Sequence, residues 1–62
     1  MLMLYAVKVW RASEPHRYET IWVRTYTARR AQLLALESYP GCNAQTRGVF
    51  TEGTWHRAMH DD

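Results

Sequence analysis

The side chains near the start of the chain fall into two sets with a period of two. Over Met3–Arg11 one set is Met3, Tyr5, Val7 and Val9 and the other is Leu4, Ala6, Lys8 and Trp10, which predicts a β-strand with one strongly apolar face. Alternation resumes over Tyr18–Tyr26, after a polar segment, Ala12–Arg17, that contains Pro15 and predicts a loop. Two alternating segments joined in this way indicate an antiparallel hairpin.

The period then changes from two to that of a helix. Thr27 can cap the start of a helix through its hydroxyl, and Pro40 followed by Gly41 predicts its end. Between them, Ala28–Tyr39 consists mostly of strong helix formers. One side of this helix is unusually flat, which suits close packing on a sheet. The residues that recur on this side at spacings of three and four are Ala28, Ala31, Ala35 and Tyr39.

The last third of the chain predicts a second, weaker hairpin. Cys42–Phe50 has the pattern of a third strand, and Thr51–Thr54 that of a tight turn with Gly53 in the left-handed conformation. Trp55–Met59 is expected to form a short fourth strand paired with the third. The alternative is a tail that only Trp55 anchors. Residues 60–62 are expected to be disordered.

These elements predict an α+β fold in which residues 1–62 form a single domain. Its antiparallel sheet has three or four strands, in the order ββαββ or ββαβ plus a tail, and one helix packs on one face. The side chains expected under the helix are Tyr5, Val7, Val9, Ile21 and Val23. No second helix covers the opposite face of the sheet, which we call the open face. It is expected to carry Lys8, Trp10, Tyr18, Trp22, Arg24, Tyr26 and Arg47.

Charge is unevenly distributed along the chain. Residues 1–50 hold seven cations against three carboxylates, whereas residues 51–62 hold one against three. Seven of the eight cations are arginines, which form planar contacts with carboxylates, phosphates and aromatic rings. Arg29 and Arg30 lie in the first turn of the predicted helix, where the helix dipole disfavours cations. With Leu33, they predict an outward-facing group that we call the helix patch.

Residues with catalytic or metal-binding chemistry are few. Cys42, the one cysteine, follows the end of the predicted helix, where the dipole disfavours a thiolate. The sequence lacks a nucleophile elbow, a phosphate-binding glycine loop and an H-E-x-x-H motif. His56 and His60 are four residues apart, but in a strand this spacing separates them by about 13 Å. We therefore predict a non-enzymatic protein with no metal and no cofactor.

One cysteine excludes an intramolecular disulfide and favours a reduced, cytoplasmic setting. The first ten residues are apolar, but they carry Lys8 and lack the basic segment of a signal peptide. No apolar run approaches the roughly 18 residues of a membrane span. We expect no membrane partner.

The spacing Ala28-x2-Ala31-x3-Ala35-x3-Tyr39-Pro40-Gly41, entered from a hairpin and followed by a strand, resembles many short proteins of phages and other mobile elements. From the hairpin to GVFTEGTW (residues 48–55), the order of elements is also similar to that of some small anti-CRISPR proteins. Those inhibitors bind CRISPR surveillance complexes and block target-DNA binding or nuclease recruitment. The resemblance implies a protein that docks on another protein in the cytoplasm of a bacterial host. It implies no site residues, because those inhibitors share no binding signature.

Two binding functions follow from these surfaces. The first is docking on a partner protein, as an anti-defence inhibitor that acts by steric occlusion. Its expected contact residues are Trp10, Trp22, Arg24, Tyr26, Arg29, Arg30 and Leu33. The alternative is an accessory or regulatory protein that binds nucleic acid through the open face, with Lys8, Trp10, Trp22, Arg24 and Arg47. A homodimer whose open faces bury each other is a third arrangement.

Overall fold

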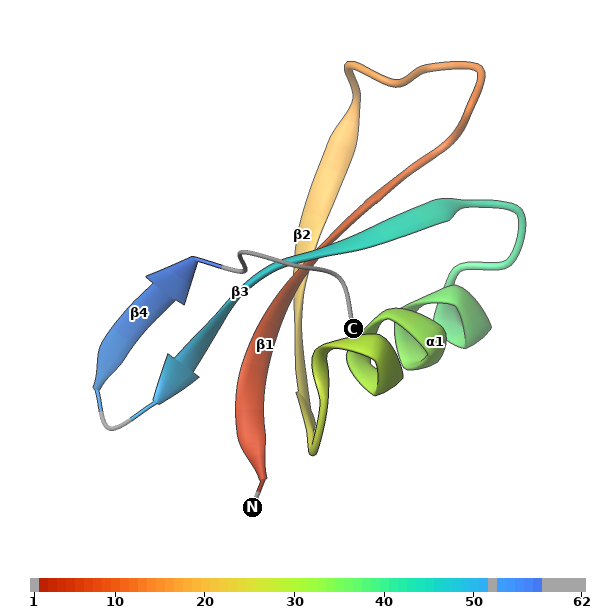
Figure 1. The fold of residues 1–62 in the computed structure, drawn as a ribbon. Helices are drawn as coiled ribbons and strands as arrows, with labels where there is room; N and C mark the ends of the chain where they lie inside the picture. The colour runs from red at the N-terminus through yellow and green to blue at the C-terminus, as the bar shows by residue number, and fades with distance from the viewer. Residues whose placement is uncertain (1, 52, 58–62) are drawn as a thin grey trace.

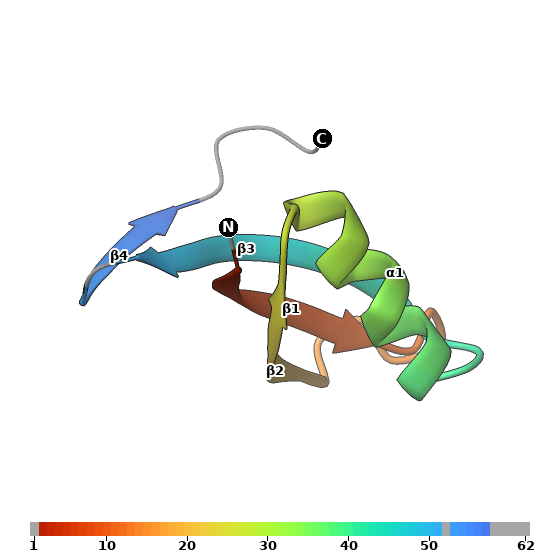
Figure 2. The same cartoon turned by 90° about the horizontal axis from the view of Figure 1, so that it is seen from below.

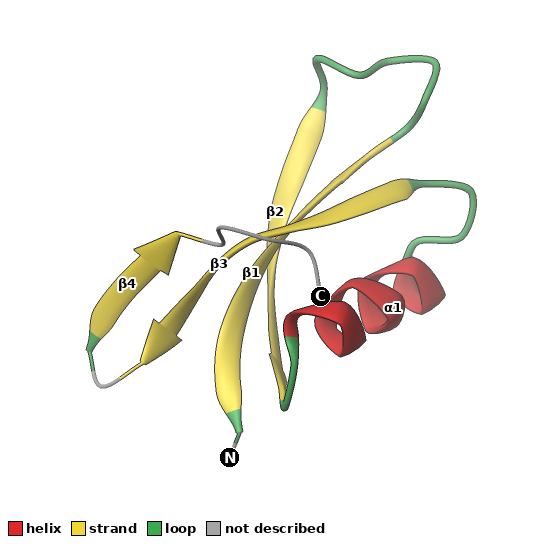
Figure 3. Cartoon of the chain, in the orientation of Figure 1, coloured by secondary structure: helices red, strands yellow, loops and turns green. Residues whose placement is uncertain are grey.

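A computed structural model describes residues 2–51 and 53–57 of the chain. The described residues form four strands and one helix (Figures 1 and 3): β1 (Met3–Trp10), β2 (Tyr18–Thr25), α1 (Ala28–Ser38), β3 (Asn43–Thr51) and β4 (Thr54–Arg57). All four strands lie in one antiparallel sheet with the order β2-β1-β3-β4. The predicted α+β fold is confirmed in its ββαββ form, and the alternative with a tail in place of the fourth strand is wrong.

Figure 2 shows α1 lying against one face of the sheet, and the hydrophobic core lies between them. Val7, in the middle of β1, has no exposed surface, and Ala31 of the helix is equally buried. The buried core residues are Tyr5, Val7, Val9, Ala28, Ala31 and Ala35, with Ile21, Val23 and Tyr39 partly buried against them. This set confirms the predicted core. Within the described residues, no helix has the length and apolarity that a membrane span requires.

The ends of α1 are fixed by the residues that the sequence indicates. The Thr27 hydroxyl accepts a hydrogen bond from the Arg30 N–H at 3.1 Å, which confirms the predicted cap. After the helix, Gly41 has a φ of 84°, a conformation that glycine adopts without strain. The buried Thr46 hydroxyl of β3 donates to the Ala28 carbonyl at 2.8 Å. This bond ties the first turn of the helix to the sheet.

Each strand of the first hairpin and the helix are one residue shorter than predicted. β1 ends at Trp10 rather than at Arg11, and β2 ends at Thr25 rather than at Tyr26. α1 ends at Ser38, because Tyr39 leaves the helical conformation and becomes the C-cap. Tyr26 therefore lies just beyond the strand in which it was predicted.

The second hairpin is shifted relative to the prediction. β3 spans Asn43–Thr51 rather than Cys42–Phe50, and β4 (Thr54–Arg57) begins one residue before the predicted start at Trp55. Gly53, in the turn between them, has the predicted left-handed conformation with a φ of 78°. The expectations for Met59 and for residues 60–62 lie outside the described residues.

A β-bulge in β3 has no counterpart in the predictions. Ala6 pairs with Gly48, but the next residue of β1, Val7, pairs with Thr46. Arg47 is therefore an extra residue that β1 does not match. A bulge of this kind bends its strand and increases the local twist.

β4 is attached to the molecule differently from the other strands. In the described chain, α1 contacts β1, β2 and β3 but not β4, which lies at the sheet edge away from the helix (Figures 1 and 2). All four residues of β4 are exposed. Its position therefore depends on pairing with β3 and on the contacts of Trp55.

Candidate interaction surface

The open face is built by alternate residues of the four strands. Ala6 of β1 lies opposite Trp22 of β2 and also opposite Gly48 of β3. On the same face, Phe50 of β3 lies opposite Trp55 of β4. Large rings on the two outer strands therefore flank the smallest residues on the two inner strands.

Trp22 and Trp55 meet across this space. Their ring centroids are 5.8 Å apart, and the ring planes are inclined by 77°, an edge-to-face arrangement. β2 and β4 are the outermost strands, which in a flat sheet would lie about 14 Å apart. A Cβ at position 48 would lie 2.6 Å from Cη2 of Trp55, so that ring rests directly on Gly48. The structure thus shows that Trp55 folds back over the sheet, a point that the sequence left open.

Lys8 lies beside two further rings of the open face. Its Nζ is 4.5 Å from the ring centroid of Tyr18 and 5.3 Å from that of Trp10. Cation–π contacts at exposed sites contribute about 0.5–1 kcal/mol. The ammonium group is therefore held close to the aromatic surface.

These side chains surround a shallow hollow of about 460 Å³. Its lining residues are Ala6, Lys8, Tyr18, Thr20, Trp22, Arg47 and Trp55. Tyr18 is 58% exposed, Trp22 54% and Trp55 44%. The contact between the two tryptophans therefore leaves much of each ring accessible to a ligand.

The described part of the open face carries charge of one sign. By register and by the lining of the hollow, its cations are Lys8, Arg24, Arg47 and Arg57. The described strand residues of this face include no carboxylate. Glu19, the one acidic residue of β2, lies opposite Val9 and therefore points to the helix side. Fixed charges of one sign attract anions and speed their encounter with the surface.

The structure divides the predicted contact residues into two groups. Lys8, Trp10, Trp22, Arg24 and Arg47 share the open face. The helix patch, by contrast, is exposed on α1, away from its buried alanine face. A hollow of about 520 Å³ there is lined by Arg30, Leu33, Leu34, Leu36 and Glu37.

Tyr26 belongs to neither group. It is exposed beyond the end of β2, and its carbonyl accepts a hydrogen bond from the Tyr5 hydroxyl at 3.3 Å. Trp55 was not among the predicted contact residues, although it lines the hollow. The sequence feature that could have indicated Trp55 is the tight turn at Gly53. This turn pairs Phe50 with Trp55 and therefore places both side chains on one face of the sheet.

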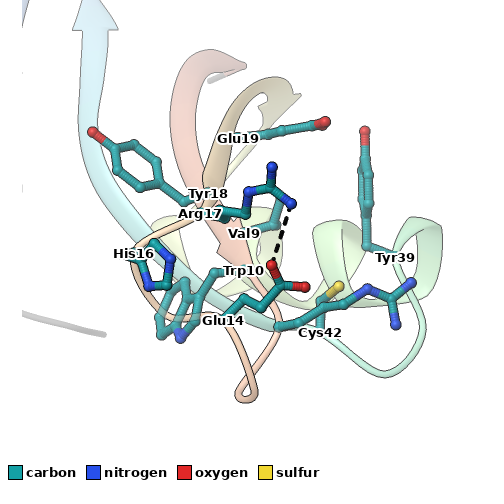
Figure 4. A pocket seen from close by; sticks show the side chains of 10 residues that line it. Val9, Trp10, Glu14, His16, Arg17, Tyr18, Glu19, Tyr39 and Cys42 are labelled. Atoms are coloured by element: carbon teal, nitrogen blue, oxygen red, sulfur yellow. Dashed lines mark hydrogen bonds and ion pairs between the residues drawn. The ribbon is translucent and has the colours of Figure 1, made fainter.

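A third hollow, of about 610 Å³, lies where the loop between β1 and β2 approaches the end of α1 (Figure 4). Arg17 and Glu14 form an ion pair of 3.3 Å in this region, and Cys42, a free thiol, is half-buried. Both signs of charge line this hollow, unlike the described part of the open face. Among the described residues, no group of three or more His, Cys, Asp or Glu side chains could hold a metal ion.

Comparisons with protein-family models, with curated proteins and with solved structures find no match for this chain. We therefore infer its function from its own geometry.

Proposed function

We propose that this protein is a non-enzymatic binding protein whose open face docks on an anionic partner. One observation carries this proposal: on the described part of the open face, half-exposed aromatic rings stand beside four cations and no carboxylate. Tryptophan, tyrosine and arginine are enriched among the few residues that dominate the free energy of binding at interfaces. Charge of one sign selects a partner of the opposite sign.

An acidic protein is the first partner class. Arg24 and Arg47 would pair with its carboxylates, while Trp22 and Trp55 would bury apolar area in the contact. A domain of 62 residues held in this way blocks whatever the covered surface otherwise binds. In this form the protein is an anti-defence inhibitor of the phage type that acts by steric occlusion in the cytoplasm of a bacterial host.

Nucleic acid is the second partner class. The aromatic hollow with Lys8 and Arg47 at its lining specifically favours it, because sheets that bind single strands combine stacking rings with cations. In this form the protein is an accessory or regulatory nucleic-acid-binding protein.

Titration with polyglutamate and with DNA oligonucleotides at low salt tests the proposal, with tryptophan fluorescence as the signal. We expect at least one polyanion to bind, and the charge reversal Arg24→Glu with Arg47→Glu to abolish binding. The matched control is Arg29→Glu with Arg30→Glu, which reverses two charges on the helix patch and should leave binding unchanged. Loss of binding only in the helix variant would move the docking surface to α1. No binding to any polyanion would refute the proposal.

A homodimer that buries the open face would make that face unavailable. Light scattering at high protein concentration checks this arrangement, and we expect the mass of a monomer. A dimer that Trp22→Ala dissociates, but Leu33→Ala does not, would show that the open face is occupied by a second copy.

A further inference from the structure

The hollow on the open face has the features of a site for a ligand that carries one flat ring and a negative charge next to it. Its walls are the rings of Tyr18, Trp22 and Trp55, and its volume of about 460 Å³ falls within the range of small-molecule sites, roughly 300–1,000 Å³. Trp22 meets Trp55 edge to face rather than in a stack. Together with the exposure of Trp22, this geometry leaves ring surface open to a flat ligand.

Two cationic side chains, Lys8 and Arg47, line the same hollow. Lys8 is held 4.5 Å from the Tyr18 ring centroid, and Arg47 is the extra residue of the bulge. The bulge thus adds a guanidinium group to a strand position that the regular ladder does not use. A ligand that stacks a flat ring on Trp22 and carries an anionic group beside that ring could therefore contact both Lys8 and Arg47 in this hollow.

We propose that the anionic partner is single-stranded nucleic acid, and that this hollow stacks one of its bases while Lys8 and Arg47 contact adjacent phosphates. This inference rests on the proposed function and narrows it to one partner class. A single strand presents both the planar faces of its bases and its phosphates, whereas a duplex hides the base faces in its stack. Carboxylates of a protein would pair with Lys8 and Arg47. A protein, however, has no flat rings that alternate regularly with its negative charges, as the bases of a single strand alternate with its phosphates.

The test measures fluorescence anisotropy of a labelled oligo(dT) strand, a duplex of the same length, and labelled polyglutamate, each at two salt concentrations. We expect the single strand to bind most tightly, with tryptophan quenching at saturation. Trp22→Leu keeps an apolar contact for Trp55 but removes the stacking ring. It should weaken single-strand binding about 5- to 150-fold, equivalent to about 1–3 kcal/mol. Leu33→Ala, on the opposite side of the molecule, is the matched control and should have no effect.

A second variant keeps the test independent of the tryptophan contact. Affinity for a single strand falls as salt rises. Arg47→Gln should make the plot of log affinity against log salt shallower by about 0.7, the value expected for one lost phosphate contact on a single strand. Its control, Arg29→Gln, should leave the slope unchanged.

The outcomes separate this inference from the function that it narrows. Tight binding of polyglutamate without binding of oligo(dT) would overturn the inference and leave the proposed function standing, with an acidic protein as partner. Equal affinity for duplex and single strand, with Trp22→Leu unaffected, would overturn the stacking site. Binding of none of the three probes would refute both.

Discussion

Replacing Gly48 with alanine tests whether Trp55 holds β4 on the sheet. The added Cβ would lie 2.6 Å from Cη2 of Trp55 and 2.5 Å from the carbonyl oxygen of His56. Ordinary contacts of a Cβ begin near 3.4 Å. Either the indole ring and the His56 carbonyl both move by about 1 Å while β4 stays paired, or β4 separates from β3.

The expected loss in the free energy of unfolding can be estimated for each of these two responses. If β4 stays in place, an extra methyl in a packed site costs about 1–3 kcal/mol. If β4 separates, Trp55, a residue that is now 44% exposed, loses its burial. With roughly 250 Å² of surface for a tryptophan, that burial is about 140 Å², or at most about 3.5 kcal/mol at ~25 cal/mol per Å². We therefore expect the free energy of unfolding to fall by about 1–3 kcal/mol.

Urea denaturation followed by tryptophan fluorescence measures this loss, and the melting temperature should fall by about 4–8 °C per kcal/mol. The same substitution in a Trp55→Ala background gives the coupling energy, which should exceed about 0.5 kcal/mol. A Gly48→Ala protein within about 0.5 kcal/mol of the wild type would refute the reasoning. An undiminished cost in the Trp55→Ala background would place the strain on the His56 backbone instead of on the ring.

Three further substitutions test the core and the helix start by denaturant unfolding. Thr46→Val removes the buried hydrogen bond to the Ala28 carbonyl and should cost about 1 kcal/mol; no loss would mean that this bond adds nothing to stability. Val7→Ala removes two methyl groups from a fully buried side chain and should cost about 2 kcal/mol; a cost below about 0.5 kcal/mol would contradict a close-packed core. Thr27→Ala removes the cap on the Arg30 N–H and should cost about 1 kcal/mol, with Thr27→Ser as the control that restores it.

Local periodicity was enough to predict the elements and the core. Alternation in β1 puts Tyr5, Val7 and Val9 on one side, and the alanine spacing of α1 produces the complementary face. Both patterns are read within a few residues, where backbone geometry alone determines which side chains share a face. The helix start at Thr27 depends on an equally local bond.

Features that depend on distant residues were not predictable in the same way. The sequence indicated two hairpins, but the order β2-β1-β3-β4 comes from the pairing of β1 with β3, which are separated by β2 and α1. The alternation in β3 also breaks at Arg47, because Thr46 and Val49 both lie on the helix side with two residues between them. The contact of Trp22 with Trp55 follows from the curvature of the sheet.

The bulge also determines where β3 tolerates a change in length. Thr46 faces the helix and Gly48 faces away, so the two would alternate correctly if they were joined directly. A deletion of Arg47 therefore keeps the other side chains of β3 on the faces that they now occupy. In a regular strand such as β1, loss of one residue sends every residue beyond it to the opposite face. A one-residue insertion or deletion at position 47 therefore adds or removes a cation on the open face without any compensating change in the core.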